Sequence, residues 1–428
     1  MLNKIIDFYE NLELITPVQV KNTSQFNTPV NFKQSKTVPR HRWFTYKEGF
    51  SPFFVEDFIN LYSSKKDNVI FDPFGGIGTT VLEAGLKGYQ SYSNDINPMS
   101  NYIAKIKTRN YSNQDVELIE QLSFKMIKDE FIEKVDSPAN KTVVKYFNDE
   151  NLDFILRAKH WIENIKIKHI KSLFDLALLS SLEEISTHKK DGNGVKRKKN
   201  FQPVTDDPNL KQILLNKINI YIEDILKTKI VVKPKIHNQS SFESYTFPSK
   251  VDLVLTSPPY ANCFDYSKIY LIELWFGGFF KQKEDQIKFR NSSVTSHVHY
   301  KWDNRHEDYC SKLVNDYIQP YLITQELWNR NIPRMLVGYF SDLGKVLHEM
   351  KANLNPGAKI GFVVGNSVYA GVPIATDMIL ADLAQVMGYQ LIGVESYRFL
   401  TPSSQQMSKI KEEHKKYLRE SLVILQWN

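Results

Sequence analysis

The sequence predicts an α/β fold built on a doubly wound mixed sheet, and three observations predict it. Residues 69–71 form a short apolar run, typical of a buried strand, which stops at Pro73 and the glycines that follow it. A helical pattern then continues to Gly88, and a second strand at residues 90–94 leads to Asp95. A strand, glycine turn, helix and strand closed by an acidic residue is the layout of one nucleotide-binding half of such a sheet.

The later apolar segments extend the sheet and add helices. Between residues 99 and 228 the apolar positions recur every three or four residues, which predicts a helical insertion. Residues 251–255 are apolar apart from Asp252, as expected of a strand covered on both faces. Further strands are expected at residues 230–236, 359–364, 390–395 and 421–426, and helices at residues 269–276 and 375–387.

This pattern divides the chain into four parts. Residues 1–110 hold the first part of the sheet domain, and residues 111–228 form the helical insertion. Residues 229–280 and 335–428 complete the sheet domain. The segment 281–334 between them is polar, basic and aromatic, and we expect it to form a smaller region outside the sheet.

Composition bounds the class of protein. The 428 residues are 42% hydrophobic and 13% aromatic, which supports a sizeable packed core, and the formal net charge of +7 suits a polyanionic partner without requiring one. No uninterrupted apolar run reaches about 18 residues, so we expect a cytoplasmic protein without a membrane span. The two cysteines, Cys263 and Cys310, permit neither a disulfide framework nor a four-cysteine zinc site, and no metal site is expected.

A basic run at residues 188–200 interrupts the helical insertion. Its lysines and glycines predict a mobile loop. Such a run is usually a solvated surface, but it could equally contact the phosphates of a nucleic acid, and the two interpretations stay open.

The glycine turn, residues 72–80 (Asp-Pro-Phe-Gly-Gly-Ile-Gly-Thr-Thr), is the first motif with chemical meaning. Its glycines let a ligand approach the backbone, and the following helix offers unpaired N–H groups. The Asp72 carboxylate suits a cationic or amino-bearing ligand better than a pyrophosphate. Alone the turn is weak evidence for cofactor binding, since tight turns in α/β proteins need glycine anyway. Asp95 strengthens the case for a ligand site, because it lies 23 positions after Asp72, near the spacing at which an acidic residue accepts hydrogen bonds from a ribose. Asp95 could instead cap a helix.

The decisive motif is Thr256-Ser257-Pro258-Pro259-Tyr260, directly after the apolar strand at residues 251–255. The prolines fix the turn and leave carbonyls without local N–H donors, Ser257 adds a hydroxyl, and Tyr260 adds a flat aromatic face. A planar amine fits this arrangement. A base rotated out of a duplex could stack on Tyr260 while Ser257 and the Pro258 carbonyl hold its amino group. A bare Pro-Pro is more often only a rigid turn, but here it follows a buried strand beside a glycine turn and a ribose-type acid.

These motifs together resemble those of the amino-group DNA methyltransferases. The resemblance implies an S-adenosylmethionine cofactor, a double-stranded DNA substrate and a flipped target base. Through the matching positions it implies cofactor contacts at Phe50, Ser51, Asp72, Phe74, Gly75, Gly76, Gly78, Thr79, Thr80 and Asp95. It implies catalytic roles for Ser257, Pro258, Pro259 and Tyr260, and the serine form of the second motif is similar to the subgroup that methylates cytosine N4. We therefore predict a cytosine-N4 DNA methyltransferase of a restriction-modification or related system. Whether a restriction endonuclease is its partner, and the oligomeric state, stay open.

Two departures from the family pattern stand beside this resemblance. Residues 237–241 contain no acidic residue for the adenine amine of the cofactor, and the cofactor motif precedes the base motif, as in alternative permutations of the family. Asp265 could orient the base, but a helix cap is the favoured interpretation. Methylation at cytosine C5 is disfavoured, because the enzymes that do it place a nucleophilic cysteine after a proline, and neither cysteine here follows one.

Recognition of a target sequence needs a basic and aromatic surface outside the sheet, and two segments qualify. One is the helical insertion with its basic run. The other is the segment 281–334, with Arg290, His297, His299, Tyr300, Lys301, Trp302 and Arg305. The sequence does not choose between them. Adenine N6 methylation, an RNA base as substrate, and a nucleic-acid-binding subunit without catalysis are the alternative functions.

Overall fold

The computed structural model describes residues 1–21, 28–192, 194–199, 202, 204–299, 306–401 and 409–428. Its centre is a mixed sheet with the strand order β1-β11-β12-β8-β7-β2-β3-β6. β12 runs antiparallel to both of its neighbours, and the other seven strands of this sheet run in one direction. The strands are β1 (Gln19–Val20), β2 (Val69–Asp72), β3 (Gln90–Asp95), β6 (Lys235–Asn238), β7 (Val251–Thr256), β8 (Leu354–Gly365), β11 (Gln390–Phe399) and β12 (Arg419–Gln426). The predicted doubly wound mixed sheet is confirmed.

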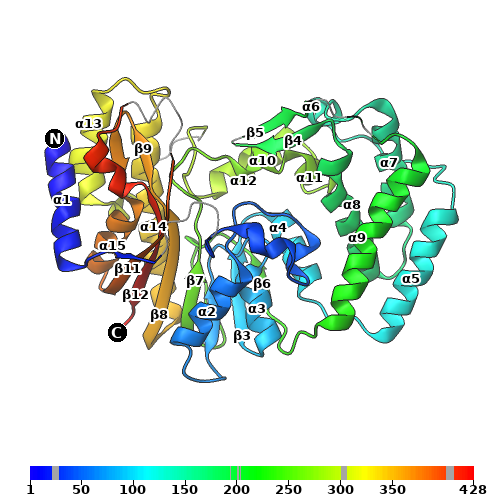
Figure 1. The fold of residues 1–428 in the computed structure, drawn as a ribbon, viewed down its shortest axis with the longest axis horizontal. Helices are drawn as coiled ribbons and strands as arrows, with labels where there is room; N and C mark the ends of the chain where they lie inside the picture. Colours follow the sequence, from blue (N-terminus) through cyan, green and yellow to red (C-terminus); the bar gives the residue numbers. More distant parts are fainter. Residues whose placement is uncertain (22–27, 193, 200–201, 203, 300–305, 402–408) are drawn as a thin grey trace.

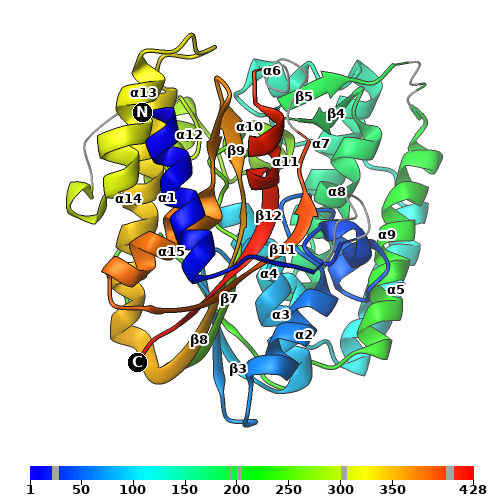
Figure 2. The same ribbon diagram turned by 60° about the vertical axis from the view of Figure 1, so that its left-hand side comes forward.

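Alternating side chains of the central strands bury into two hydrophobic layers. Phe71 and Val254 face the layer that contains α1 (Leu2–Ile15), α14 (Ile332–Met350) and α15 (Thr376–Val386). Ile70 and Leu255 face the opposite layer, formed by α2 (Pro52–Tyr62) and α3 (Thr79–Lys87). Successive residues of a strand point to opposite faces, so a strand covered on both sides must be apolar throughout. Figures 1 and 2 show these helices on the two sides of the sheet.

The helical insertion forms a second hydrophobic cluster beside the sheet, on the right of Figure 1. Its helices are α5 (Asn113–Lys128), α6 (Lys141–Val144), α7 (Asp149–Glu163), α8 (Lys168–Ile185) and α9 (Asp207–Lys227). The preceding helix, α4 (Pro98–Lys107), packs in the same cluster. Polar caps define helix starts in the insertion: Ser112 and Asp115 form a capping box at α5, and Asn148 and Asp206 cap α7 and α9. Three later helices, α10 (Tyr266–Ile269), α11 (Leu271–Phe276) and α12 (Lys283–Ser292), join this cluster to the sheet.

The basic run is not a loop. Two antiparallel strands, β4 (His188–Asp191) and β5 (Gly194–Arg197), pair as a hairpin. Lys190 anchors it, because this side chain is buried and pairs with the carboxylates of Glu273 and Glu183. The prediction of a mobile loop is therefore wrong: partners far along the chain order a segment whose local charge pattern indicated solvent.

Other element boundaries shift for local reasons. The strand expected at 230–236 becomes β6 at Lys235–Asn238, because residues 231 and 232 donate to the Gly85 carbonyl instead and Pro234 has no N–H. The helix expected at 269–276 is divided at Tyr270 into α10 and α11. The helices that were not predicted include α1 and α14, and α14 has Pro333 in its first turn. A short strand pair, β9 (Ser367–Tyr369) with β10 (Val372–Ile374), lies outside the main sheet.

Candidate active site

The two motifs lie side by side at the carboxyl ends of neighbouring parallel strands. β2 ends at Asp72 and pairs with β7, which ends at Thr256. The Thr256 hydroxyl donates a hydrogen bond to Asp72 Oδ1 at 2.6 Å, and the Phe74 N–H donates to Thr256 Oγ1 at 3.2 Å. Two residues 184 positions apart in the chain thus meet on one surface, where open α/β sheets bind their ligands.

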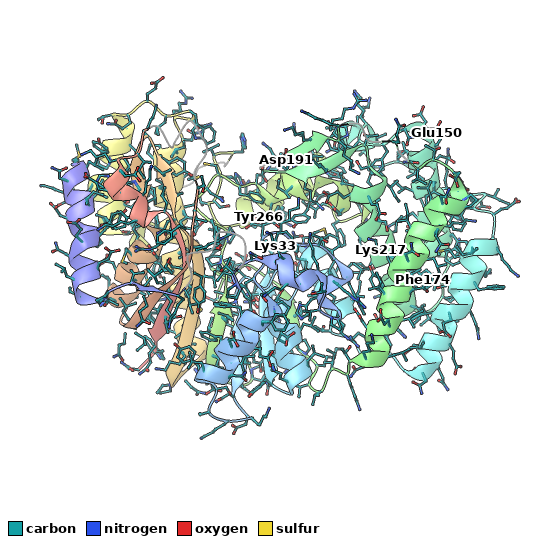
Figure 3. The ribbon with its side chains drawn as sticks, viewed as in Figure 1. Lys33, Glu150, Phe174, Asp191, Lys217 and Tyr266 are labelled. Atoms are coloured by element: carbon teal, nitrogen blue, oxygen red, sulfur yellow. The ribbon has the colours of Figure 1, made fainter. Side chains whose placement is uncertain are left out.

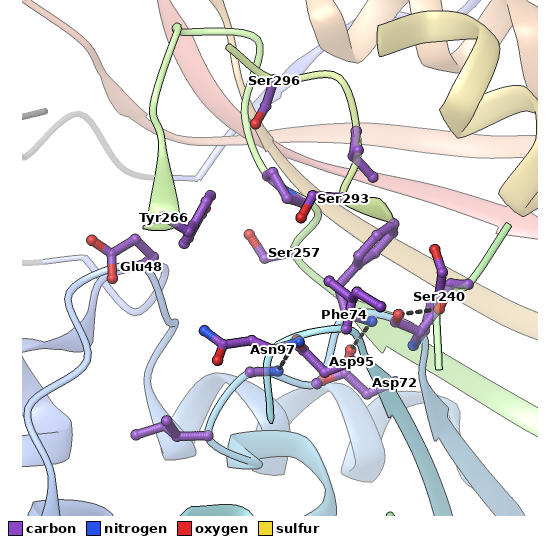
Figure 4. Close-up of a pocket in the computed structure, with 18 of the residues that line it drawn as sticks. Glu48, Asp72, Phe74, Asp95, Asn97, Ser240, Ser257, Tyr266, Ser293 and Ser296 are labelled. Atoms are coloured by element: carbon purple, nitrogen blue, oxygen red, sulfur yellow. Dashed lines mark hydrogen bonds between the residues drawn. The ribbon is translucent and has the colours of Figure 1, made fainter. Parts of the chain in front are cut away.

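A cavity of about 950 Å³, counting the open solvent at its mouth, lies above this edge of the sheet. Its floor is the glycine turn with Asp95, and its walls come from four other parts of the chain (Figure 4). These parts are residues 46–50, which precede α2, residues 239–241, which follow β6, residues 257–266, which follow β7, and residues 289–297, at and after the end of α12.

Two carboxylates at the floor are held by backbone N–H groups. Asp95 accepts hydrogen bonds from the N–H groups of Gly76 and Asn97, both at 2.7 Å, and so ties β3 to the glycine turn. Asp72 accepts from the Phe74 N–H at 3.0 Å. Burial raises the pKa of each carboxyl to about 6, although the hydrogen bonds oppose that rise. The floor therefore favours a ligand that brings positive charge or hydroxyl donors.

The glycines of the turn meet separate steric demands. A Cβ on Gly75 would lie 1.9 Å from the Ser93 hydroxyl oxygen, so β3 excludes any side chain there. Gly78 has φ of 83° and precedes α3, in a conformation that L residues with side chains avoid. Close backbone approach and left-handed geometry thus explain why this turn needs glycine.

Nine of the predicted cofactor and base residues line this cavity: Phe50, Asp72, Phe74, Gly75, Gly76, Thr79, Asp95, Ser257 and Pro259. Three others lie behind its surface. Ser51 caps α2 by accepting a hydrogen bond from the Phe53 N–H, and Thr80 donates to the Leu255 carbonyl at 3.3 Å. Gly78 packs against Ala104. These three support the walls rather than form them.

Pro258 and Tyr260 lie in a second, wider cavity of about 1650 Å³. It is lined from one side by Lys33 and the hairpin residue Asp191, and Figure 3 labels both around the opening beside Tyr266. The two cavities share four residues: Glu48, Gly49, Ser257 and Tyr266. In Figure 4 Ser257 lies between Glu48 and Tyr266 on one side and the floor carboxylates on the other. A group bound in one cavity can therefore meet a group bound in the other beside Ser257.

Several lining residues were not predicted individually. Glu48 accepts a hydrogen bond from the Tyr270 hydroxyl, and burial raises the pKa of its carboxyl. Tyr266 and residues 292–297 also line the first cavity. A carboxylate in the aromatic stretch 41–50 is the one signal that could have indicated Glu48. The contribution of residues 292–297 depends on the tertiary position of α12, which has no sequence signature.

The segment after β6, residues 239–241, brings no acidic side chain to the cavity, as its sequence indicated. Gln239, Ser240 and Ser241 line the cavity, and the Ser241 hydroxyl donates to the Pro73 carbonyl, so neutral groups stand where an acidic residue was missing. Asp265 caps α10 by accepting from the Ser267 N–H at 3.0 Å, which confirms the favoured interpretation. It also pairs with Arg290.

Of the residues expected on a DNA-reading surface, Arg290 is half-buried and His297 is buried. Arg290 contacts Asp265 and the Ser267 hydroxyl, and His297 is 3% exposed and lines the first cavity. Sequence alone indicated a basic surface because the partner carboxylate lies on a different element. His299 is exposed. Tyr300, Lys301, Trp302 and Arg305 lie outside the described residues.

The described helices include none long and apolar enough to cross a membrane. Among the described residues no group of three or more histidine, cysteine, aspartate or glutamate side chains could hold a metal ion.

The sheet has one reversed strand, and its glycine turn lies beside a cavity at the carboxyl edge, where open α/β sheets bind their ligands. A family model described as D12 class N6 adenine-specific DNA methyltransferase matches residues 54–176. The chain is similar to the amino-group DNA methyltransferases, whose methyl donor is S-adenosylmethionine. The carboxylates of Asp72 and Asp95 fit this cofactor, which carries a cationic sulfonium, an ammonium group and ribose hydroxyls.

Two relatives align over most of the chain. The Type II methyltransferase M.BsoBI of Geobacillus stearothermophilus is 28% identical, over 91% of this chain and 87% of the relative. The Type II methyltransferase M.AvaI of Nostoc sp. is 26% identical, over 85% of this chain and 81% of the relative. Among solved structures, the rRNA methyltransferase aviRa from Streptomyces viridochromogenes aligns with 91% of this chain and 85% of its own at 10% identity, with a TM-score of 0.28, and no argument rests on it.

Cofactor affinity should fall as the solution becomes more acidic. Asp72 and Asp95 have pKa values raised to about 6, so both carboxylates become protonated between pH 7.5 and pH 5 and lose the charge that a cation prefers. Titration calorimetry at pH 7.5, 6.5 and 5.5 should show the loss. The ligand-free protein should respond in the opposite direction at these two sites, because a carboxyl whose pKa is higher folded than unfolded stabilises the fold as pH falls through 6. An affinity that does not change over this range would contradict the assignment of both carboxylates.

Proposed function

We propose that this chain is a Type II DNA methyltransferase that transfers a methyl group to the exocyclic N4 of cytosine. This proposal depends on the position of Ser257, which lines both cavities. The first cavity would hold the cofactor and the second a base rotated out of the duplex, and Ser257 would contact the amino group where they meet. The relatives named above support the Type II assignment through their own names.

The cofactor would lie across the carboxyl edge of the sheet. Asp95 would accept hydrogen bonds from the ribose hydroxyls, since each of its oxygens already accepts one backbone N–H and keeps a further lone pair. Asp72 would stabilise the cationic end, and Phe50 with Phe74 would supply apolar contacts. When bound, S-adenosylmethionine supplies an electrophilic methyl group on a sulfonium centre.

Chemistry would depend on position rather than on a strong base. Tyr260 would stack on the base, and the Ser257 hydroxyl with the Pro258 carbonyl would accept hydrogen bonds from its amino group. The amino nitrogen would then form the new bond to the methyl carbon, while the carbon–sulfur bond breaks and leaves its electron pair on sulfur. The nitrogen would lose one proton to water in the second cavity. The carbonyl oxygen would stabilise the positive charge that develops on nitrogen.

Cytosine N4 is proposed on the serine of the second motif, whereas the description of the matching family model favours adenine N6. Digestion of DNA from cells that express this chain, followed by mass spectrometry of the nucleosides, separates the two. We expect N4-methylcytosine. N6-methyladenine would replace the proposal with the second candidate, and unmodified DNA together with no S-adenosylmethionine binding by calorimetry would indicate a subunit without catalysis. Single-molecule sequencing of the same DNA gives the methylated sequence.

The β4–β5 hairpin is proposed to contact DNA phosphates beside the second cavity. Asp191 and Gly192 at its turn line that cavity, and its exposed Lys189, Lys196 and Arg197 add positive charge. Changing these three cations to glutamine should weaken DNA binding and flatten the dependence of log K on log salt. The slope should fall by about 0.9 for every phosphate that the variant no longer neutralises. Fluorescence anisotropy of a labelled duplex at several salt concentrations measures both effects.

The matched control changes Lys65 and Lys66 to glutamine. These lysines are also exposed, but they lie between α2 and β2, at the opposite edge of the sheet from the cavities. They should leave the salt slope unchanged. An equal loss in both variants would indicate a general charge effect and would remove the hairpin from the DNA interface.

A further inference from the structure

Three adjacent strands place a row of linked residues in the wall of the second cavity. Gly365 of β8 is directly opposite Glu420 of β12, and Glu420 is the register partner of Arg398 on β11. All three line this cavity together with Tyr260. Residues directly opposite in neighbouring strands point to the same face of a sheet, so the row presents its side chains together.

Tyr260 is fixed at one end of this row. A Cβ on Gly365 would lie 2.6 Å from the Tyr260 ring, so the ring packs flat onto a position that only glycine leaves open. The Tyr260 hydroxyl donates a hydrogen bond to Glu420 Oε1 at 2.6 Å. Ring and hydroxyl are thus both held, and the ring has one defined orientation.

Glu420 links the ring to a cation. Its side chain is buried, and its second oxygen accepts a hydrogen bond from Arg398 Nε. A buried carboxylate costs free energy unless it is paired and hydrogen-bonded, and here both donors also line the cavity. An apolar residue would fill the same space without that cost, so the pairing serves the groups that it orients.

Arg398 brings donors to a site where a base is proposed to bind. Nε contacts Glu420, and a guanidinium carries four further N–H donors in a planar fork. Beside its amino group, cytosine offers two acceptors, N3 and O2, on one edge. Adenine offers a single acceptor, N1, at the corresponding place. Paired donors therefore match cytosine better than adenine.

We propose that Tyr260, Glu420 and Arg398 form a cytosine-recognition row in which Glu420 positions both the stacking ring and a guanidinium that binds N3 and O2 of the flipped base. Arg398 is the specificity-determining residue, and Glu420 is a positioning residue that acts through its two neighbours. This inference rests on the proposed cytosine-N4 activity.

The test compares Arg398→Met with the unchanged protein on two duplexes that carry the methylated sequence found by sequencing. One duplex has cytosine at the target position and the other has adenine. We expect kcat/KM on cytosine to fall roughly 5- to 150-fold, the range for a good bidentate contact, and the value on adenine to change less than threefold. An equal fall on both bases, or no fall on cytosine, overturns the role of Arg398.

Two further variants test the positioning role. Tyr260→Phe removes only the hydroxyl, and Glu420→Gln keeps the shape but removes the charge. Each should lower kcat with little change in cofactor affinity, and the double variant should lose less than the product of the two single losses, because both act on one linkage. Multiplicative losses would show that the two residues act independently and would overturn the row.

A control variant separates a specific effect of Arg398 from the loss of any ion pair on β11. Lys21→Met removes another cation that pairs with a carboxylate of β11, Glu395 at 3.0 Å, and neither residue lines a cavity, so activity should not change. If Arg398→Met melts at a markedly lower temperature because Glu420 loses its partner, the double variant Arg398→Met with Glu420→Gln carries the same base comparison. The nucleoside product of the unchanged protein separates the two failures: N6-methyladenine refutes the proposed function, whereas N4-methylcytosine with an unselective Arg398→Met refutes only the row.

Discussion

Replacing Asp72 by asparagine should weaken S-adenosylmethionine binding by roughly 10- to 150-fold, because a hydrogen bond or ion contact to a charged group contributes about 1.5–3 kcal/mol. Asparagine keeps an oxygen that can accept from the Thr256 hydroxyl and the Phe74 N–H. The local fold should therefore persist, and the loss would report the charge. Titration calorimetry measures the affinity directly.

The same substitution should raise the thermal stability of the ligand-free protein at pH 7.5. Burial moves the pKa of Asp72 from 3.8 to about 6, and ionising this group in the folded protein therefore costs on the order of 1–3 kcal/mol. The matched control is Asp252→Asn on β7. Its carboxylate also binds a backbone N–H, that of Val69 at 2.8 Å, but at the amino end of the strand. Unchanged affinity in Asp72→Asn, or an equal loss in Asp252→Asn, would remove Asp72 from the cofactor site.

Replacing Tyr260 by alanine should lower the turnover of DNA methylation by about 100- to 1000-fold while S-adenosylmethionine binds as before. Stacking of one base on an aromatic ring contributes about 1–3 kcal/mol, and without that stacking the base would also leave the geometry that transfer requires. Single-turnover methylation of a duplex that carries the recognised sequence separates this step from product release.

Tyr62→Ala offers the matched control for this prediction. Tyr62 ends α2 and packs against Phe58 with ring centroids 4.8 Å apart, far from either cavity lining. The Tyr62→Ala variant should be slightly less stable and should methylate DNA at the unchanged rate. A Tyr260→Ala protein that methylates DNA at the normal rate would refute the stacking role, and one that no longer binds the cofactor would indicate that the loop had collapsed.

The sheet and the two motifs could be predicted because their signals are local. Residues 69–71 and 253–255 are apolar because both faces of the sheet are covered there, and the glycines of residues 75–78 meet steric demands of the turn itself. The adjacency of β2 and β7 follows from the topology of doubly wound sheets. A sequence pattern that reflects short-range geometry can be recognised without knowing which distant segment it contacts.

The parts that escaped prediction depend on contacts between distant segments. Lys190 is read as a surface lysine until Glu273 is placed beside it, and Arg290 likewise until Asp265 is found. The row of Gly365, Glu420 and Arg398 exists only through strand register, which separates its members along the chain. Ion pairs across elements have no periodicity, so composition assigned these charges to solvent.

The wall shared by the two cavities has a thermodynamic consequence. Both cavities are lined by Glu48, Gly49, Ser257 and Tyr266. If one ligand orders these residues, the second ligand binds without the entropic cost of ordering them. Cofactor and duplex should therefore bind with positive cooperativity. Linkage requires the factor by which S-adenosylmethionine tightens DNA to equal the factor by which DNA tightens S-adenosylmethionine, and measuring both on one preparation closes the cycle.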